Sequence, residues 1–176
     1  MSATLRGEGA LELVSEATEQ TIELGRVLGG LLEVGDVLVL TGDLGAGKTQ
    51  LTKGVAAGLG ISADVTSPTF NIQCIYEGGR LPLYHFDLYR LSDADQLGDA
   101  GVYDALDGDG ACLIEWGEQF ADDLGDERVD VTLERMDEDA VADGEEPARR
   151  IEFAPHGERA RELVAALAKA VGAVRE

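Results

Sequence analysis

The chain has 176 residues, a formal net charge of -21 and 44% hydrophobic residues. This length predicts one domain with a core of its own, and no apolar stretch is long enough to cross a membrane. The acidic excess argues against direct binding of nucleic acids or anionic membranes, because like charges repel.

The two cysteines, Cys74 and Cys112, lack the C-x-x-C spacing of a metal or redox motif. Isolated cysteines of this kind are typical of reduced proteins, so we expect a cytoplasmic location. The first ten residues show no basic segment followed by an apolar one, and a signal peptide is therefore not expected.

The first part of the chain predicts a strand, a helix and a second strand. Residues 11–14 form a short apolar run, and Ser15 is the expected N-cap of the helix that follows. An apolar stripe at helical spacing then runs from Ala17 to Leu31. Residues 37–41 are continuously apolar, which is typical of a parallel strand buried on both faces.

A complete phosphate-binding loop follows this strand. Residues 42–49 read Gly-Asp-Leu-Gly-Ala-Gly-Lys-Thr, and Leu51, Val55 and Leu59 behind them predict a helix. Backbone N–H groups of such a loop and the helix N-terminus attract phosphate, whereas a glycine-rich turn without function is the alternative. We expect Lys48 to reach the β- and γ-phosphates of a nucleotide and the Thr49 hydroxyl to bind Mg²⁺. The expected nucleotide contacts are Gly42, Asp43, Leu44, Gly45, Ala46, Gly47, Lys48, Thr49 and Gln50.

A hydroxyl-rich loop stands shortly after the predicted helix. It contains Thr66, Ser67 and Thr69. Switch segments that sense a γ-phosphate occur at such places, and an ordinary polar turn is an equally good reading.

A hairpin is predicted next, with strands over residues 70–76 and 81–87. Strand alternation puts His85 and Asp87 on one face. Asp87 is the candidate that orients or deprotonates an attacking water, or holds a metal-bound water. For His85, a hydrogen-bonded structural role is favoured over a role as catalytic base.

A buried strand over residues 111–115 ends in an acid, after a helical region around 92–106. Phosphate-loop enzymes place a second acid near the metal at such a strand end, so Glu115 is the candidate second Mg²⁺ ligand. A strand-end acid that meets solvent is the alternative reading.

The remaining elements are a short helix at 118–124, strands at 129–133 and 150–153, an acidic surface loop at about 137–146 and a final helix near 160–171. Together, the elements predict a single domain over residues 1–176. Its expected fold is a three-layer α/β P-loop NTPase fold with a mostly parallel central sheet and antiparallel additions.

Three nucleotide-dependent functions fit these residues. No Asn-Lys-x-Asp stretch supports guanine recognition, and no arginine-rich lid of a small-molecule kinase is apparent. An ATPase is the favoured interpretation. A small-molecule kinase and a nucleotide-dependent binding switch with incidental hydrolysis remain as alternatives.

Four motifs in order and spacing resemble the TsaE family, the small ATPase of bacterial threonylcarbamoyladenosine synthesis in tRNA. They are the loop at 42–49, Thr-Ser-Pro-Thr-Phe at 66–70, His-Phe-Asp-Leu-Tyr-Arg at 85–90 and Ile-Glu-Trp at 114–116. The chain departs from many members in having Gly117, where proline is common, and the resemblance fades after about residue 125.

The resemblance implies a Mg²⁺-dependent ATPase that works with TsaB and TsaD, with tRNA contacted only through that complex. It places Lys48 on phosphate, Thr49 and Glu115 on Mg²⁺, and Asp87 in hydrolysis. It also implies that Trp116 lies close to the nucleotide and that Thr69 reports the nucleotide state to the partners.

Overall fold

The computed structural model describes residues 1–136 and 146–175, so the acidic loop predicted at 137–146 lies outside the described residues, except for Glu146. The strands are β1 (Ser2–Leu5), β2 (Leu11–Ser15), β3 (Val37–Thr41), β4 (Gln73–Tyr76), β5 (Leu83–Asp87), β6 (Ala111–Glu115), β7 (Arg128–Arg135), β8 (Arg149–His156) and β9 (Val174–Arg175). The helices are α1 (Thr18–Leu31), α2 (Lys48–Gly58), α3 (Gln96–Asp99), α4 (Val102–Leu106) and α5 (Glu158–Ala170), with 3₁₀ turns η1 (Gly7–Gly9) and η2 (Glu118–Asp123).

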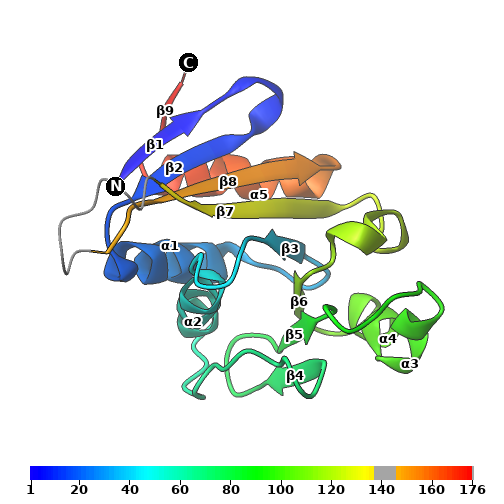
Figure 1. Ribbon diagram of the computed structural model, residues 1–176. Coiled ribbons are helices and arrows are strands. Elements are labelled where there is room, and N and C mark those ends of the chain that lie inside the picture. The colour runs from blue at the N-terminus through cyan, green and yellow to red at the C-terminus, as the bar shows by residue number, and fades with distance from the viewer. Residues whose placement is uncertain (137–145, 176) are drawn as a thin grey trace.

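All described strands join one sheet in the order β4-β5-β6-β3-β7-β8-β2-β1-β9 (Figure 1). Strands β5, β6, β3 and β7 are parallel neighbours, whereas β4 pairs antiparallel with β5, and β7, β8, β2 and β1 form an antiparallel series. The expectation of a mostly parallel sheet is wrong, because the antiparallel ladders pair more residues. Short connections such as residues 6–10, between β1 and β2, can join only antiparallel neighbours.

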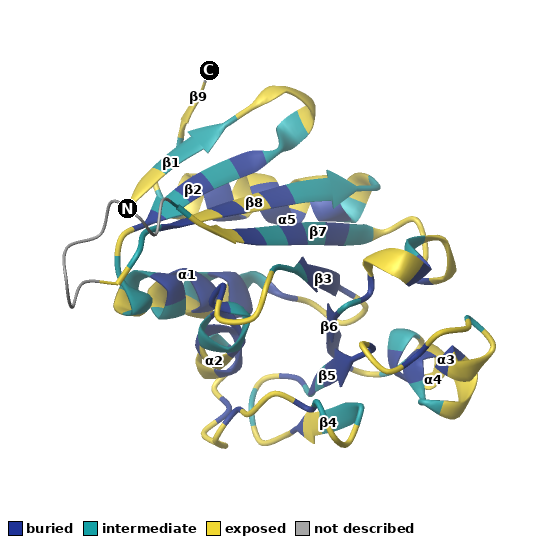
Figure 2. Cartoon of the chain, in the orientation of Figure 1, coloured by how far each residue is buried: buried dark blue, intermediate teal, exposed yellow. Residues whose placement is uncertain are grey.

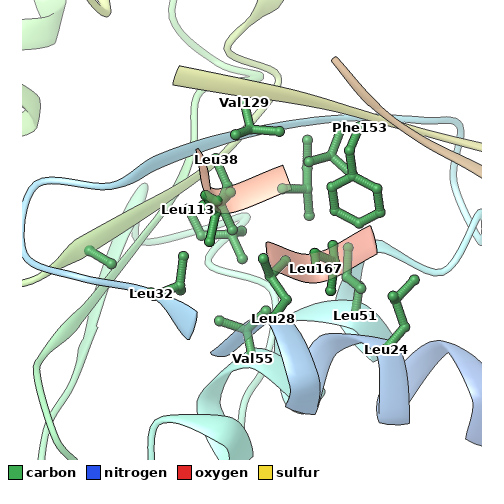
Figure 3. Close-up of a cluster of buried hydrophobic side chains, with 14 of the residues drawn as sticks. Leu24, Leu28, Leu32, Leu38, Leu51, Val55, Leu113, Val129, Phe153 and Leu167 are labelled. Carbon is green, nitrogen blue, oxygen red and sulfur yellow. The ribbon is translucent and has the colours of Figure 1, made fainter. Parts of the chain in front are cut away.

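Helices cover both faces of the three central strands, β5, β6 and β3. On one face, Leu38 of β3 packs with a cluster that includes Leu24 of α1 and Leu51 of α2, which Figure 3 shows. On the other face, Val39 and Ile114 pack with residues of α3, α4 and η2. This sandwiching explains why the strand at 37–41 reads as a continuous apolar run.

The antiparallel wing, which we define as β7, β8, β2 and β1, has a different burial pattern. Along β7, β8 and β2, buried residues alternate with residues that are exposed or half-buried, as the striped colouring in Figure 2 shows. Phe153 and Ile151 of β8 point into the core with α5, and Glu152 between them is exposed. The wing therefore buries one face only.

Helices α1 and α2 cross with their backbones in contact. A Cβ atom on Gly54 would lie 2.0 Å from the Ile22 carbonyl oxygen, and one on Gly25 would lie 2.3 Å from the Leu51 oxygen. Only glycine fits at these two positions. The close crossing fixes α2, and with it the loop that precedes Lys48, against α1.

Two local predictions are wrong for backbone reasons. Ser15 does not cap a helix: it ends β2, is buried, and its hydroxyl bonds the Ala17 carbonyl at 2.9 Å and the Thr21 hydroxyl at 2.8 Å. The strand expected from residue 70 begins only at Gln73, because Ile72 has a φ of 63°.

In the described part of the chain, no helix is long and apolar enough to cross a membrane.

Candidate functional site

The predicted phosphate-binding loop connects β3 to α2. Gly45 and Gly47 have φ angles of 79° and 108°, a region that residues with a Cβ rarely adopt. Helix α2 begins at Lys48 directly after this turn, so the free N–H groups of its first turn lie at the loop. The strand, loop and helix therefore have the local geometry that the sequence predicts.

A cleft of ≈ 650 Å³ lies beside this loop, a size typical of small-ligand sites. Its walls come from the loop and α2, from the segment after α2, from the ends of β5 and β6, and from the starts of α1 and β8. The lining residues are Thr18, Leu44, Gly45, Gly47, Lys48, Thr49, Gln50, Ser67, Thr69, Asp87, Tyr89, Glu115, Trp116, Glu146 and Arg149.

Lys48 is held at the cleft by the loop and by an aromatic ring. Its Nζ donates to the carbonyl oxygen of Gly42 and, at 3.1 Å, to that of Asp43. The same Nζ lies 5.5 Å from the ring centroid of Trp116, whose φ is 58°. Tyr89 packs edge-on against Trp116 at 5.0 Å. The ammonium group is thereby kept beside the glycine loop, at one side of the cleft.

Glu115 and Asp87 end two neighbouring parallel strands and are paired in register. Glu115 is only 2% exposed and lies 3.1 Å from Nε2 of His85, which is fully buried. Because a carboxylate can only accept, we assign the His85 proton to Nε2. This hydrogen bond suits the structural role favoured from the sequence, in which His85 orients Glu115.

Asp87 also contacts the hydroxyl-rich loop that follows α2. One carboxylate oxygen accepts the Tyr89 backbone N–H at 3.0 Å, and the other accepts the Thr69 hydroxyl at 3.3 Å. Ser67 in turn bonds Thr69 at 2.9 Å. Thr66 is not part of the cleft, because its backbone is bonded to the Tyr76 hydroxyl instead.

Most of the predicted site residues thus meet in one place. Gly42 and Asp43 serve through the carbonyls that hold Lys48, whereas Ala46 is 2% exposed and packs in the core. Among the described residues, no three His, Cys, Asp or Glu side chains gather to hold a metal unaided. Thr49 and Glu115 still fit Mg²⁺, since that ion usually binds one or two protein oxygens plus phosphate and water.

Four lining residues were missed from the sequence: Thr18, Tyr89, Glu146 and Arg149. The Thr18 hydroxyl bonds the Glu146 carboxylate at 2.5 Å, and Arg149 lies 3.5 Å from the same oxygen. The Thr18 hydrogen bond and the nearby Arg149 charge lower the pKa of Glu146. One signal was available, since Arg149 sits two residues before Ile151, on the apolar face of its strand.

The chain is similar to several known proteins. The family model described as threonylcarbamoyl adenosine biosynthesis protein TsaE matches residues 15–144. Proteins named tRNA threonylcarbamoyladenosine biosynthesis protein TsaE are similar to the chain. The one from Treponema pallidum is 46% identical over 70% of this chain and 90% of its own, and the one from Bacillus subtilis is 44% identical over 69% and 75%. The crystal structure of Bacillus subtilis YdiB superposes with a TM-score of 0.75 at 34% identity, over 92% of this chain and 96% of that one.

Proposed function

The chain belongs to the TsaE family, and from this premise we propose that it is a Mg²⁺-dependent P-loop ATPase supporting tRNA threonylcarbamoyladenosine synthesis. It acts in the cytoplasm together with TsaB and TsaD, and its fold is that of the P-loop NTPases. The observation that carries the proposal is the single cleft that brings Lys48, Thr49, Asp87 and Glu115 together beside a glycine loop.

Each residue has a distinct part in binding and hydrolysing ATP. The loop N–H groups and Lys48 bind the β- and γ-phosphates, where negative charge increases in the transition state. Thr49 and Glu115 hold Mg²⁺, which when bound neutralises phosphate charge. Asp87 positions the attacking water near the γ-phosphate. Its bond to Thr69 connects the hydroxyl-rich loop directly to the residue that positions the water.

Contact with tRNA belongs to the partner proteins. The net charge of -21 repels a polyanion, and several arginines of this chain are engaged with its own acids. Examples are Arg26 with Glu23 and Arg159 with Asp36. The isolated chain should therefore bind tRNA weakly at low salt as well as at physiological salt, and tight, salt-sensitive binding in a titration would contradict this assignment.

The decisive experiment measures phosphate release from ATP by the chain alone, by TsaB with TsaD, and by all three proteins together. We expect Mg²⁺-dependent release that requires this chain and rises when its partners are added. Transfer of the γ-phosphate to a small molecule would instead favour the kinase alternative. Binding without hydrolysis in any mixture would favour the binding switch.

A further inference from the structure

Arg149 is a buried cation whose hydrogen bonds are incomplete. It opens β8, is 7% exposed, and its Nε–H finds no acceptor among the residues that the structure describes. Its one described polar contact joins Nη1 to Glu146 at 3.5 Å, a long and weak interaction with a largely exposed carboxylate. A buried charged donor without an acceptor is costly, so its presence requires a reason.

Arg149 also occupies a strand position at which an apolar side chain is expected. Burial in β8 alternates so that Arg149 shares a face with Ile151 and Phe153, both fully buried. An apolar side chain is the ordinary occupant of such a position. Arg150, the next residue, lies on the open face and makes only loose ion pairs of 3.8–3.9 Å with Glu134 and Glu12.

The guanidinium lies against the phosphate-binding loop. A Cβ atom on Gly47 would come within 3.1 Å of both Cδ and Nε of Arg149, so the side chain passes directly over that glycine. Arg149 also lines the same cleft as Lys48. Antiparallel pairing explains how it arrives there: β8 starts where β7 ends, with Arg149 in register with Arg135.

Charge adds a second argument. Besides Lys48, the described lining residues of the cleft include one cation, Arg149, against the three carboxylates of Asp87, Glu115 and Glu146. A polyanionic ligand in such surroundings needs more than one lysine. An arginine with a free N–H donor is suited to phosphate oxygens because charge-assisted bonds are short and strong.

Resting on the function proposed above, we propose that Arg149 is a nucleotide-binding residue that donates to the α-phosphate and ribose end of the nucleotide. The order of the strands in the sheet indicates which end of the nucleotide Arg149 contacts. Glu115 and Asp87 lie on one side of β3, on β6 and β5, and are assigned to the terminal phosphate. Arg149 approaches from the other side, across β7, and therefore meets the opposite end of the ligand.

Calorimetric titration of Arg149→Gln with ADP, a non-hydrolysable ATP analogue and pyrophosphate, all with Mg²⁺, tests the proposal. We expect about tenfold weaker binding of both nucleotides, equal for the two, with pyrophosphate affected less than threefold. Arg150→Gln is the matched control, since it removes the same charge one residue away, and it should bind all three ligands as the wild type does. Arg149→Lys keeps the charge but loses the planar fork, and should lie between wild type and Arg149→Gln. It also serves if the glutamine variant fails to fold.

Two results would overturn the proposal. Unchanged nucleotide affinity in both Arg149 variants would make the arginine structural only. A loss confined to the ATP analogue would place it at the γ-phosphate instead. If the wild-type chain binds neither nucleotide, the proposed function itself fails, and that outcome is visible before any variant is compared.

Discussion

The central strands and the antiparallel wing belong to one sheet but are built differently. Strands β3 and β6 are buried on both faces, whereas in β8 and β2 buried residues alternate with exposed or half-buried ones. The two acids of the candidate site, Asp87 and Glu115, come from the ends of central strands, and the loop with Lys48 follows β3. Arg149 is the contribution of the wing.

The difference shows how position in a sheet assigns roles. Parallel strands end at the same edge, so their terminal residues converge without long loops. The wing pairs antiparallel, so only some of its strand ends reach that edge, and its main contribution is a packed apolar face. We therefore expect substitutions at the ends of the central strands to affect chemistry and substitution of Arg149 in the wing to affect ligand binding, whereas buried residues of both regions contribute to stability.

The largest effect is expected for Lys48→Ala. Loss of a cation that stabilises transition-state charge should lower ATP turnover by about 100- to 1,000-fold. The melting temperature should stay close to that of the wild type, because the lysine lies on a half-exposed loop end. Lys53→Ala removes the same charge from the exposed side of α2 and is the control. Equal turnover in the Lys48→Ala and Lys53→Ala variants would show that Lys48 takes no part in ATP hydrolysis.

Asp87→Asn and Glu115→Gln should fail in different ways. If Asp87 positions water, its variant loses about 100-fold in turnover, and added Mg²⁺ does not restore it. If Glu115 holds the metal, its variant needs about 10- to 100-fold more Mg²⁺ but regains much of its turnover. A magnesium titration of the turnover rate separates the two, and a wild-type magnesium dependence in Glu115→Gln would argue against the metal role.

His85→Asn probes the same acid through its neighbour. Removing the buried ring that bonds Glu115 should raise the Mg²⁺ requirement by about tenfold, less than loss of the carboxylate itself. Turnover at saturating Mg²⁺ is the second readout, and it should fall less than the apparent metal affinity. A uniform loss of turnover at all Mg²⁺ concentrations would mean that the histidine only supports packing.

Stability should not distinguish the two regions. Ile114 of β6 and Ile151 of β8 are both fully buried, so Ile114→Val and Ile151→Val should each cost about 0.5–1.5 kcal/mol in urea denaturation. The two regions are expected to differ in their part in catalysis and not in their contribution to stability. A much smaller cost at Ile151 would show that the wing packs loosely and would weaken the comparison.

The smallest effect concerns the thiols. Burial raises the pKa of Cys112, on central strand β6, from 9.0 to about 12, so its thiolate is scarce at pH 8. A maleimide should therefore label the half-buried Cys74 first. Because the folded pKa is raised, this thiol favours the folded state below pH 9, and that contribution is lost as the pH rises towards 12. Mass spectrometry follows the labelling of each cysteine. Equal labelling rates for Cys74 and Cys112 would contradict the expected order.

Local patterns in the sequence predicted local structure well. The strands expected at 37–41 and 111–115 have these bounds in the structure, because a buried strand between turns leaves a clear apolar run. The loop at 42–49 and the two acids were likewise visible as motifs. Their roles in catalysis remain predictions.

Long-range pairing was not visible in the same way. Nothing in residues 2–5 indicates that they pair with β2 and β9, because that pairing depends on segments distant in sequence. Arg149 reaches the loop only through the register of β8 with β7, which a single sequence does not reveal. The positive φ of Ile72, which delays the start of β4, is equally a product of the surrounding structure.

The placement of Trp116 has a practical consequence for spectroscopy. It is the single tryptophan of the chain, and its indole ring lies near both the Lys48 ammonium and the Tyr89 ring at the cleft. Indole emission depends on nearby charge and water, and no second tryptophan adds background. The intrinsic fluorescence of the unlabelled protein is therefore an optical reporter of this cleft alone, suited to following ligand entry and departure in real time.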